Sequence, residues 1–534
     1  MKKRVLAIGL ALSMAMATLT GCNLGKAPET QVTNDTLQIG IVAKGYGDEF
    51  AKQLAAAFQE KTGIKTEVVK STASGEWVSS QLLAGAKNND IDIIFDISPR
   101  LMRNVAVSNY VSGYERAYVD LSEIYNEVPE GYDTDKTLEE LISPYALAAS
   151  TWGGDSEGYG DGKQYFAVYT TGVEGLVYNA DLFAEYKLTI PKTTNQLFDV
   201  MDQIKKLKAK NKDGRVIYPY VYSGKANYSN YLGVAWWAQF DGVDVFYNML
   251  EGKDASGTYS ADSLKSPGKL SAMTIVSKIM DSDNGYADEG CYTQNFTDAQ
   301  MKFLDGQAFM MSTGEWVERE MSGNFGDQDL NIQLMRAPIN SDIILQCDSV
   351  KNEKQLIEAV TYIDGEGEKP SYLSETDEAR LKEARGVICS EGNQHVAYIP
   401  AYSNMAEEAK DFLAFMYSKA GQEIMLQYSY GNMAPLDVDV TKFDNYAELS
   451  AFQKSKYGMQ TSEVGFNLVG NCYYHPMAYA GSVETFYNVP SMENAFGAVK
   501  SSDTYMTAEE IWLADYNRMA AKWDNEMKEA GVSN

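Results

Sequence analysis

The chain has 534 residues, with 46 Lys and Arg against 74 Asp and Glu, which gives a formal net charge of −28. This length suits at least two domains of ~100–200 residues each. The acidic balance argues against nucleic acid as a partner and against a basic patch that binds anionic lipid. The chain has two histidines, His395 and His475, which lie far apart in sequence. It therefore has few of the residues that a zinc site or a His-based catalytic triad requires. We predict no metal and no cofactor.

Three basic residues open the chain, and an uncharged, mostly apolar run follows as far as Leu19. The run is shorter than the ~20 residues that span a bilayer, so residues 1–21 predict an export signal. Residues 19–22, Leu-Thr-Gly-Cys, resemble the lipobox of bacterial lipoproteins. That resemblance implies that Cys22 is acylated, becomes the first mature residue and holds the protein at the membrane. The alternative is an ordinary signal peptide with an incidental cysteine.

The next hundred residues alternate between strand and helix patterns. Residues 22–35 are polar and predict a flexible tether, and residues 37–43 (LQIGIVA) read as a buried strand. A helix over 48–61 follows, with Gly63 suited to its C-terminal cap, and IKTEVV is the next strand. A helix at about 76–87 leads into the strand IDIIF. This β-α-β-α-β order is typical of a parallel sheet covered by helices.

Three helix starts carry the pattern of a capping box, in which a polar cap residue precedes Glu or Gln by three positions. They are Thr193, Asn404 and Thr507. Residues 341–395 are rich in charge and predict an exposed insertion. Besides Cys22 there are Cys291, Cys347, Cys389 and Cys472, with no CxxC pair, and the sequence does not choose among three disulfide pairings and buried thiols.

Five stretches resemble, in order, the bacterial solute-binding proteins of carbohydrate importers, the family 1 relatives of maltodextrin-binding protein. They are the strand-helix-strand at 37–69, DIDIIFDISPR at 90–100, the hairpin and Tyr-Asn pair within 162–201, FLDGQAFMMSTGEWVERE at 303–320, and the helix pair with its Gly-x-x-Pro turn at 403–436. Each is weak alone, but five in family order cover most of residues 37–436. The 341–395 insertion and the C-terminal tail do not match clearly.

The resemblance implies a two-lobed α/β protein of the periplasmic-binding-protein type (type II), in which each lobe is a mixed sheet flanked by helices and a hinge joins the lobes. We expect one lobe at 36–171 plus 397–440 and the other at 172–396 plus 441–534. The implied function is capture of a carbohydrate, with an oligosaccharide as the expected ligand, for an ABC transporter permease. The expected protein is a monomer, anchored by lipid to the outer face of the cytoplasmic membrane, and not an enzyme.

The resemblance also implies ligand-binding residues. Some belong to the first lobe, at the ends of its strands and at a helix start, where open α/β sheets present ligand sites. They are Lys44, Tyr46, Glu76, Trp77, Asp96 and Arg100. Relatives often have an aromatic residue at the position of Asp96 and an acid at that of Pro99, so this loop departs from the family's pattern at both positions.

In the second lobe the expected ligand residues are Glu174, Trp236, Trp237 and Trp316. Glu174 matches a sugar-binding acid near the hinge, and Trp316 matches the family's stacking tryptophan. Trp236 and Trp237 are adjacent and point in different directions, so one could line the cleft while the other is core. An aromatic ring covers the apolar face of a sugar, and carboxylates bind its hydroxyls.

Two other functions fit the residues less well. An acidic, aromatic cleft also suits a polyamine or a peptide, through ion pairing and cation–π contact. A surface glycoside hydrolase needs two carboxyls facing one bond, roughly 5–10 Å apart, and no motif specifies that pair.

Overall fold

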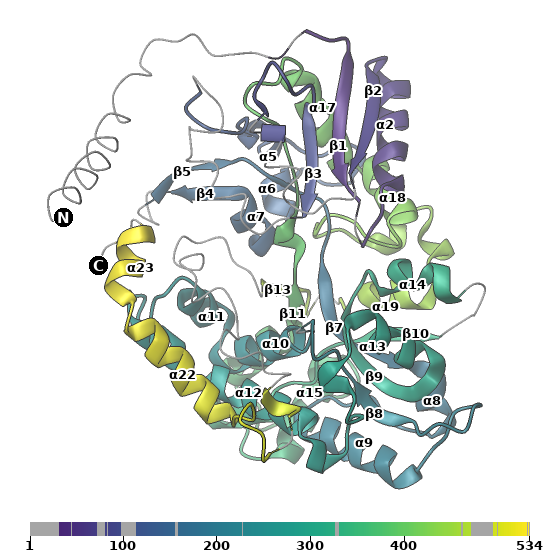
Figure 1. The fold of residues 1–534 in the computed structure, drawn as a ribbon, viewed down its shortest axis with the longest axis vertical. Coiled ribbons are helices and arrows are strands. Elements are labelled where there is room, and N and C mark those ends of the chain that lie inside the picture. Colours follow the sequence, from purple (N-terminus) through teal and green to yellow (C-terminus); the bar gives the residue numbers. More distant parts are fainter. Residues whose placement is uncertain are drawn as a thin grey trace, which may run out of the picture.

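The computed structural model describes residues 31, 33–43, 45–71, 81–82, 84–97, 114–154, 159–226, 228–325, 331–460, 463–470, 495–498, 500–530 and 532. They form two lobes, the first uppermost in Figure 1 and the second below it. The predicted two-lobed α/β fold, with a mixed sheet in each lobe, is therefore confirmed.

The first lobe is built on a sheet with strand order β2-β1-β3-β12-β6. Its strands are β1 (Thr36–Val42), β2 (Lys65–Ser71), β3 (Ile93–Ile97), β6 (Ala167–Val168) and β12 (His395–Tyr398). β1 is parallel to β2 and β3, whereas β12 is antiparallel to β3 and β6. The apolar residues of β1 are buried, as the sequence predicts.

Helices flank this sheet and follow the predicted pattern closely. α2 (Glu49–Thr62) buries Phe50, Leu54 and Phe58 and ends at Gly63, whose φ of 78° lies in the left-handed region that glycine tolerates. The other helices of this lobe are α5 (Ser122–Tyr125), α6 (Leu138–Leu141), α7 (Pro144–Ser150), α17 (Ala406–Tyr417) and α18 (Lys419–Tyr428). The hairpin of β4 (Thr151–Gly154) and β5 (Tyr159–Gln164) extends to the left in Figure 1.

The second lobe has a sheet with strand order β13-β11-β7-β9-β8, and β10 pairs with β7. Its strands are β7 (Val173–Asn179), β8 (Tyr218–Val221), β9 (Ala308–Gly314), β10 (Ile332–Met335), β11 (Val387–Ser390) and β13 (Asn467–Gly470). Its helices are α8 (Ala180–Glu185), α9 (Thr194–Leu207), α10 (Asn230–Asp241), α11 (Val243–Leu250), α12 (Pro267–Met280), α13 (Phe296–Lys302), α14 (Val317–Phe325), α15 (Glu353–Ile363), α16 (Glu375–Gly386), α19 (Ala451–Gly458), α22 (Ala508–Ala520) and α23 (Trp523–Ala530).

The chain passes between the lobes more than once. β6 and β12 belong to the first sheet, but their chain neighbours β7 and β11 belong to the second, so residues 169–172 and 391–394 are passages. A third passage joins α18, which packs on α2, to α19, which packs on β10. The domain limits given above remain a prediction.

The first two passages touch at Gly172. Its φ is +61°, and an added Cβ would lie 2.2 Å from the backbone nitrogen of Gly392. We expect Gly172→Ala to lower the free energy of unfolding by about 2–4 kcal/mol, from left-handed strain and a clash with main chain that cannot rotate away. Chemical unfolding measures this. Gly175→Ala in β7 is the control, because no atom lies within 4 Å of its added Cβ, and equal effects of the two substitutions would contradict the prediction.

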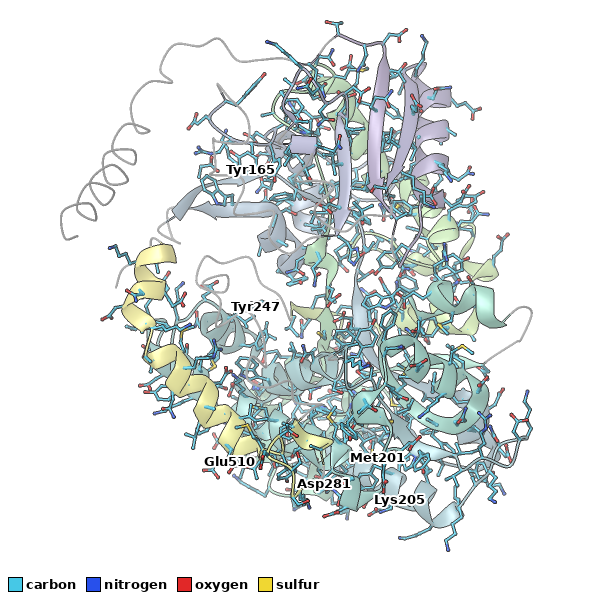
Figure 2. All side chains as sticks on the ribbon, in the orientation of Figure 1. Tyr165, Met201, Lys205, Tyr247, Asp281 and Glu510 are labelled. Atoms are coloured by element: carbon cyan, nitrogen blue, oxygen red, sulfur yellow. The ribbon has the colours of Figure 1, made fainter. Side chains whose placement is uncertain are left out.

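Two of the three predicted helix caps are confirmed. The Thr193 side chain accepts from the backbone of Gln196, and Thr507 forms a complete capping box with Glu510, which Figure 2 labels. The cap at Asn404 is wrong, since α17 begins at Ala406 with Met405 in the cap position. The Asn404 backbone nitrogen donates instead to Gln31.

The prediction that 341–395 is merely an exposed insertion is also wrong. α15 and α16 bury a separate small core, and the same segment supplies β11 to the sheet. The residues in that core include Ile343, Val350, Leu356, Val360 and Leu381. Cys291, Cys347 and Cys389 are buried thiols that form no disulfide, which decides for these three residues between the alternatives that the sequence leaves open.

Candidate functional site

The candidate site centres on Trp316, which lies two residues after the end of the fully buried strand β9. The indole folds back over the end of the strand, where an added Cβ on Gly314 would lie 2.4 Å from it, so this position requires glycine. The Trp316 side chain is 7% exposed. Its ring stands edge-on to Tyr46 of the first lobe and Tyr231 of the second, at centroid distances of 6.4 and 6.2 Å.

Two tyrosines at the start of α10 extend this aromatic surface. The rings of Tyr228 and Tyr231 are 5.1 Å apart, and Tyr228 also lies 5.8 Å from Phe296. Tyr231 is buried, whereas Tyr228 is half-buried. Burial together with nearby carboxylates raises the pKa of both phenols, so each keeps its proton and can donate a hydrogen bond.

Two carboxyl groups lie beside these phenols. Glu174, at the start of β7, is 2% exposed, and its Oε2 accepts from the thiol of Cys389 at 3.2 Å. Its Oε1 has no hydrogen-bond partner among the described residues. Burial, and secondly the charge of the half-buried Glu391 on the neighbouring passage, raises the pKa of Glu174 well above its usual 4.5. This shift favours the protonated form of Glu174, which can both donate and accept a hydrogen bond.

The neutral state of Glu174 predicts a pH dependence of stability. The folded chain holds a proton that the unfolded chain releases above about pH 4.5, so the free energy of unfolding falls as pH rises from there. Relative to Glu174→Gln, the parent should lose up to ~1.4 kcal/mol per pH unit as the pH rises above about 4.5, until the pH passes the raised pKa of the folded state. Parallel urea unfolding of the two proteins measures this, and a difference that does not change with pH would contradict it.

Tyr46 contributes to this site from the first lobe. It lies in the turn after β1, is 3% exposed, and its ring is 4.9 Å from His395 and 6.4 Å from Trp316. Its hydroxyl donates to Glu315 Oε1 at 2.9 Å. We call Tyr46, Glu174, Tyr228, Tyr231, Trp316 and Glu391 the aromatic-carboxylate cluster.

The other expected ligand residues are placed differently. Lys44, Glu76, Trp77, Arg100 and the proposed lipid site Cys22 lie outside the described residues. Asp96 is on β3 in the interior of the first lobe, with 0% exposure. Burial, and secondly the charge of Asp96, raises the pKa of Tyr169 and Tyr398.

Trp236 and Trp237 are both buried in α10 of the second lobe, and neither joins the cluster. The Trp236 indole donates to the carbonyl of Pro338 at 3.0 Å. The Trp237 indole donates to Asp241 at 2.7 Å. Indoles whose surface and N–H are already used are typical of core packing.

The sequence reasoning missed Tyr228, Tyr231, Glu391 and Glu315. Glu315 lies within the stretch FLDGQAFMMSTGEWVERE, directly before the predicted ligand residue Trp316, so the sequence contained a signal for this residue. No sequence signal pointed to the tyrosines, because the chain has 36 of them.

A separate cavity of about 370 Å³ also lies where the lobes meet. Ile142 and Pro144 line it from the first lobe, and Tyr457 and Phe466 from the second. None of the cluster residues lines this cavity.

Two lobes, joined by several passages and meeting at a cluster of rings and carboxyls, define the class of solute-binding proteins that hold a ligand between domains. The chain matches the family described as bacterial extracellular solute-binding protein over residues 53–451, and it belongs to that family. It is therefore a binding protein of an ABC transporter that works outside the cytoplasm, and not an enzyme. No curated protein matches the sequence.

Solved structures share this fold at low sequence identity. Apo RafE from Streptococcus pneumoniae is 15% identical, with a TM-score of 0.55, over 92% of this chain and 100% of RafE. The substrate-binding protein Lmo0181 from Listeria monocytogenes in complex with cycloalternan is 14% identical, with a TM-score of 0.52, over 94% and 100%. A probable secreted solute-binding lipoprotein from Streptomyces coelicolor is 14% identical, with a TM-score of 0.55, over 91% and 99%.

In the described part of the chain, no helix is both long and apolar enough to cross a membrane.

Proposed function

We propose that this protein is a lipid-anchored receptor that binds a neutral carbohydrate between its lobes and delivers it to an ABC importer. The observation that carries the proposal is the aromatic-carboxylate cluster. Trp316 and the two tyrosines provide ring surface, and the neutral Glu174 provides a donor and an acceptor at the same place. This combination matches the apolar face and the hydroxyl rim of a sugar.

The protonation of Glu174 also bears on the competing ligand. A polyamine needs ionised carboxylates, but burial, and secondly the neighbouring Glu391, raises the pKa of Glu174 and so favours its protonated, uncharged form. A neutral hydroxylated ligand therefore fits better than a cation. Lmo0181 was solved with a cyclic oligosaccharide, cycloalternan, which favours an oligosaccharide here as well.

Titration with a panel of mono- and oligosaccharides, followed by tryptophan fluorescence and calorimetry, tests the proposal. We expect saturable binding of at least one sugar, with an affinity that salt changes little, since no ion pair forms. Spermidine and short peptides are the comparison ligands. Tight, salt-sensitive binding of spermidine with no response to any sugar would replace the carbohydrate by a cation.

The lipid anchor is tested separately. Cys22→Ser should move the protein from the membrane fraction to the soluble fraction of expressing cells, because the acylation site is lost. Retention of the variant in the membrane fraction would contradict anchoring through Cys22.

A further inference from the structure

Glu315, the residue before Trp316, connects both lobes and a passage between them. It is 3% exposed and follows β9 in the second lobe. Its Oε1 accepts from the Tyr46 hydroxyl of the first lobe at 2.9 Å and from the backbone nitrogen of Gly172 at 3.0 Å. Its Oε2 accepts from Lys456 Nζ on α19 at 2.7 Å.

Lys456 fixes the carboxylate from the other side. It is 2% exposed, and its ammonium group also donates to Gly431 O at 3.0 Å and to Asn432 Oδ1 at 2.9 Å. All three of its donors are therefore used, two of them on the third passage. Burial of an ion pair costs several kcal/mol per ion, so a pair held in this way serves geometry more than stability.

We infer that the Tyr46–Glu315 hydrogen bond is an interlobe latch, in which Glu315 is a positioning residue that sets how closely the first lobe approaches the ligand face of Trp316. The hydrogen bonds from Gly172 and Lys456 hold Glu315 in place independently of the position of the first lobe. In this proposal, the Tyr46 hydroxyl reaches Glu315 only when the two lobes are close together. The packing is tight beside it, since an added Cβ on Gly45 would lie 2.9 Å from Trp316 Cβ.

The latch differs in chemistry from another contact between the lobes. Tyr145 of α7 and Tyr247 of α11 stack with centroids 6.5 Å apart, and Tyr247, labelled in Figure 2, donates to Leu468 O within its own lobe. The Tyr145 hydroxyl donates across the lobes to the main-chain carbonyl of Ser390 at 3.1 Å. That acceptor is neutral, whereas the Tyr46 hydroxyl donates to a carboxylate, and charge-assisted hydrogen bonds are roughly twice as strong as neutral ones.

Tyr46→Phe tests the latch, because it removes only the hydroxyl and keeps the ring against His395 and Trp316. Spin labels at Val128 and Leu207, 47% and 41% exposed, report the distance between the lobes, in a background with Cys22 and Cys472 replaced by serine. Tyr178→Phe is the matched control, since it removes a Tyr hydroxyl bonded to Gln333 at 3.1 Å within one lobe.

Without any ligand, we expect Tyr46→Phe to shift the distance distribution toward greater separation of the lobes, and Tyr178→Phe to match the parent. This arm needs no knowledge of the ligand, so it can fail while the proposed function stands. The second arm rests on the proposed function: Tyr46→Phe should bind the sugar about tenfold more weakly, from the lost bond to a charged group. Weaker binding with an unchanged ligand-free distribution would overturn the latch and make Tyr46 a ligand contact alone.

Discussion

Replacement of Lys456 by methionine is expected to lower the free energy of unfolding by about 3–5 kcal/mol, because it leaves the Glu315 carboxylate buried without its cation. Tyr46 and Gly172 still donate to Glu315, but neither carries charge. On the third passage Asn432 Oδ1 also loses the donor from Lys456, and Gly431 O keeps only the bond from the Tyr457 hydroxyl. Urea unfolding at pH 7 measures the loss.

Lys442→Met is the control for this prediction. Lys442 pairs with Asp439 at 3.7 Å on the surface, where the side chains are 79% and 51% exposed, and such pairs contribute about 0–1 kcal/mol. The double variant Lys456→Met/Glu315→Gln should recover part of the loss, since no unpaired charge remains. A loss no larger than that of Lys442→Met would show that the pair does not act as described.

Trp316→Ala should weaken carbohydrate binding about 30-fold or more, because a buried aromatic anchor commonly contributes ~2 kcal/mol or more to binding. The Trp316 ring also contacts both Tyr46 of the first lobe and Tyr231 of the second. Its removal therefore breaks the ring contacts that connect these two tyrosines at the site. Calorimetric titration with the sugar found by the panel measures the effect.

Trp512→Ala controls for general destabilisation. Trp512 is partly buried on α22, where its indole donates to Ser266 O at 3.2 Å. It is not a member of the aromatic-carboxylate cluster and lies far from those residues in the sequence. We expect the Trp512 variant to be less stable and to keep the parent's affinity. Equal losses of affinity in both variants would mean that Trp316 acts through folding and not through ligand contact.

Local patterns predicted the frame of the molecule well. β1, α2 and β2 lie within two residues of their predicted limits, because apolar periodicity, Gly63 and the strand runs agree with one another. Trp316 was predicted because residues 303–320 resemble a stretch of carbohydrate-binding relatives, and its ring lies next to Tyr46 of the other lobe.

Long-range pairings could not be predicted in the same way. Lys456 sits in an ordinary polar helix sequence, and its partner Glu315 is 141 residues away, so only the three-dimensional path brings them together. Trp236 and Trp237 carry the same residue type as Trp316, and only tertiary packing distinguishes core rings from a ring at the junction. The core under 341–395 was missed although α15 buries Leu356, Ala359, Val360 and Ile363 at regular helical spacing. The signal in α16 is weaker, since Leu381 and Ala384 are the apolar side chains that it buries beneath a charged surface.

Calorimetric titration of the purified protein with neutral oligosaccharides tests the central claim most directly. Saturable one-to-one binding of an oligosaccharide that is recovered chemically unchanged is the predicted result. Absence of heat with every sugar, alongside clear binding of a charged solute, would contradict a carbohydrate receptor built on Trp316 and a neutral Glu174.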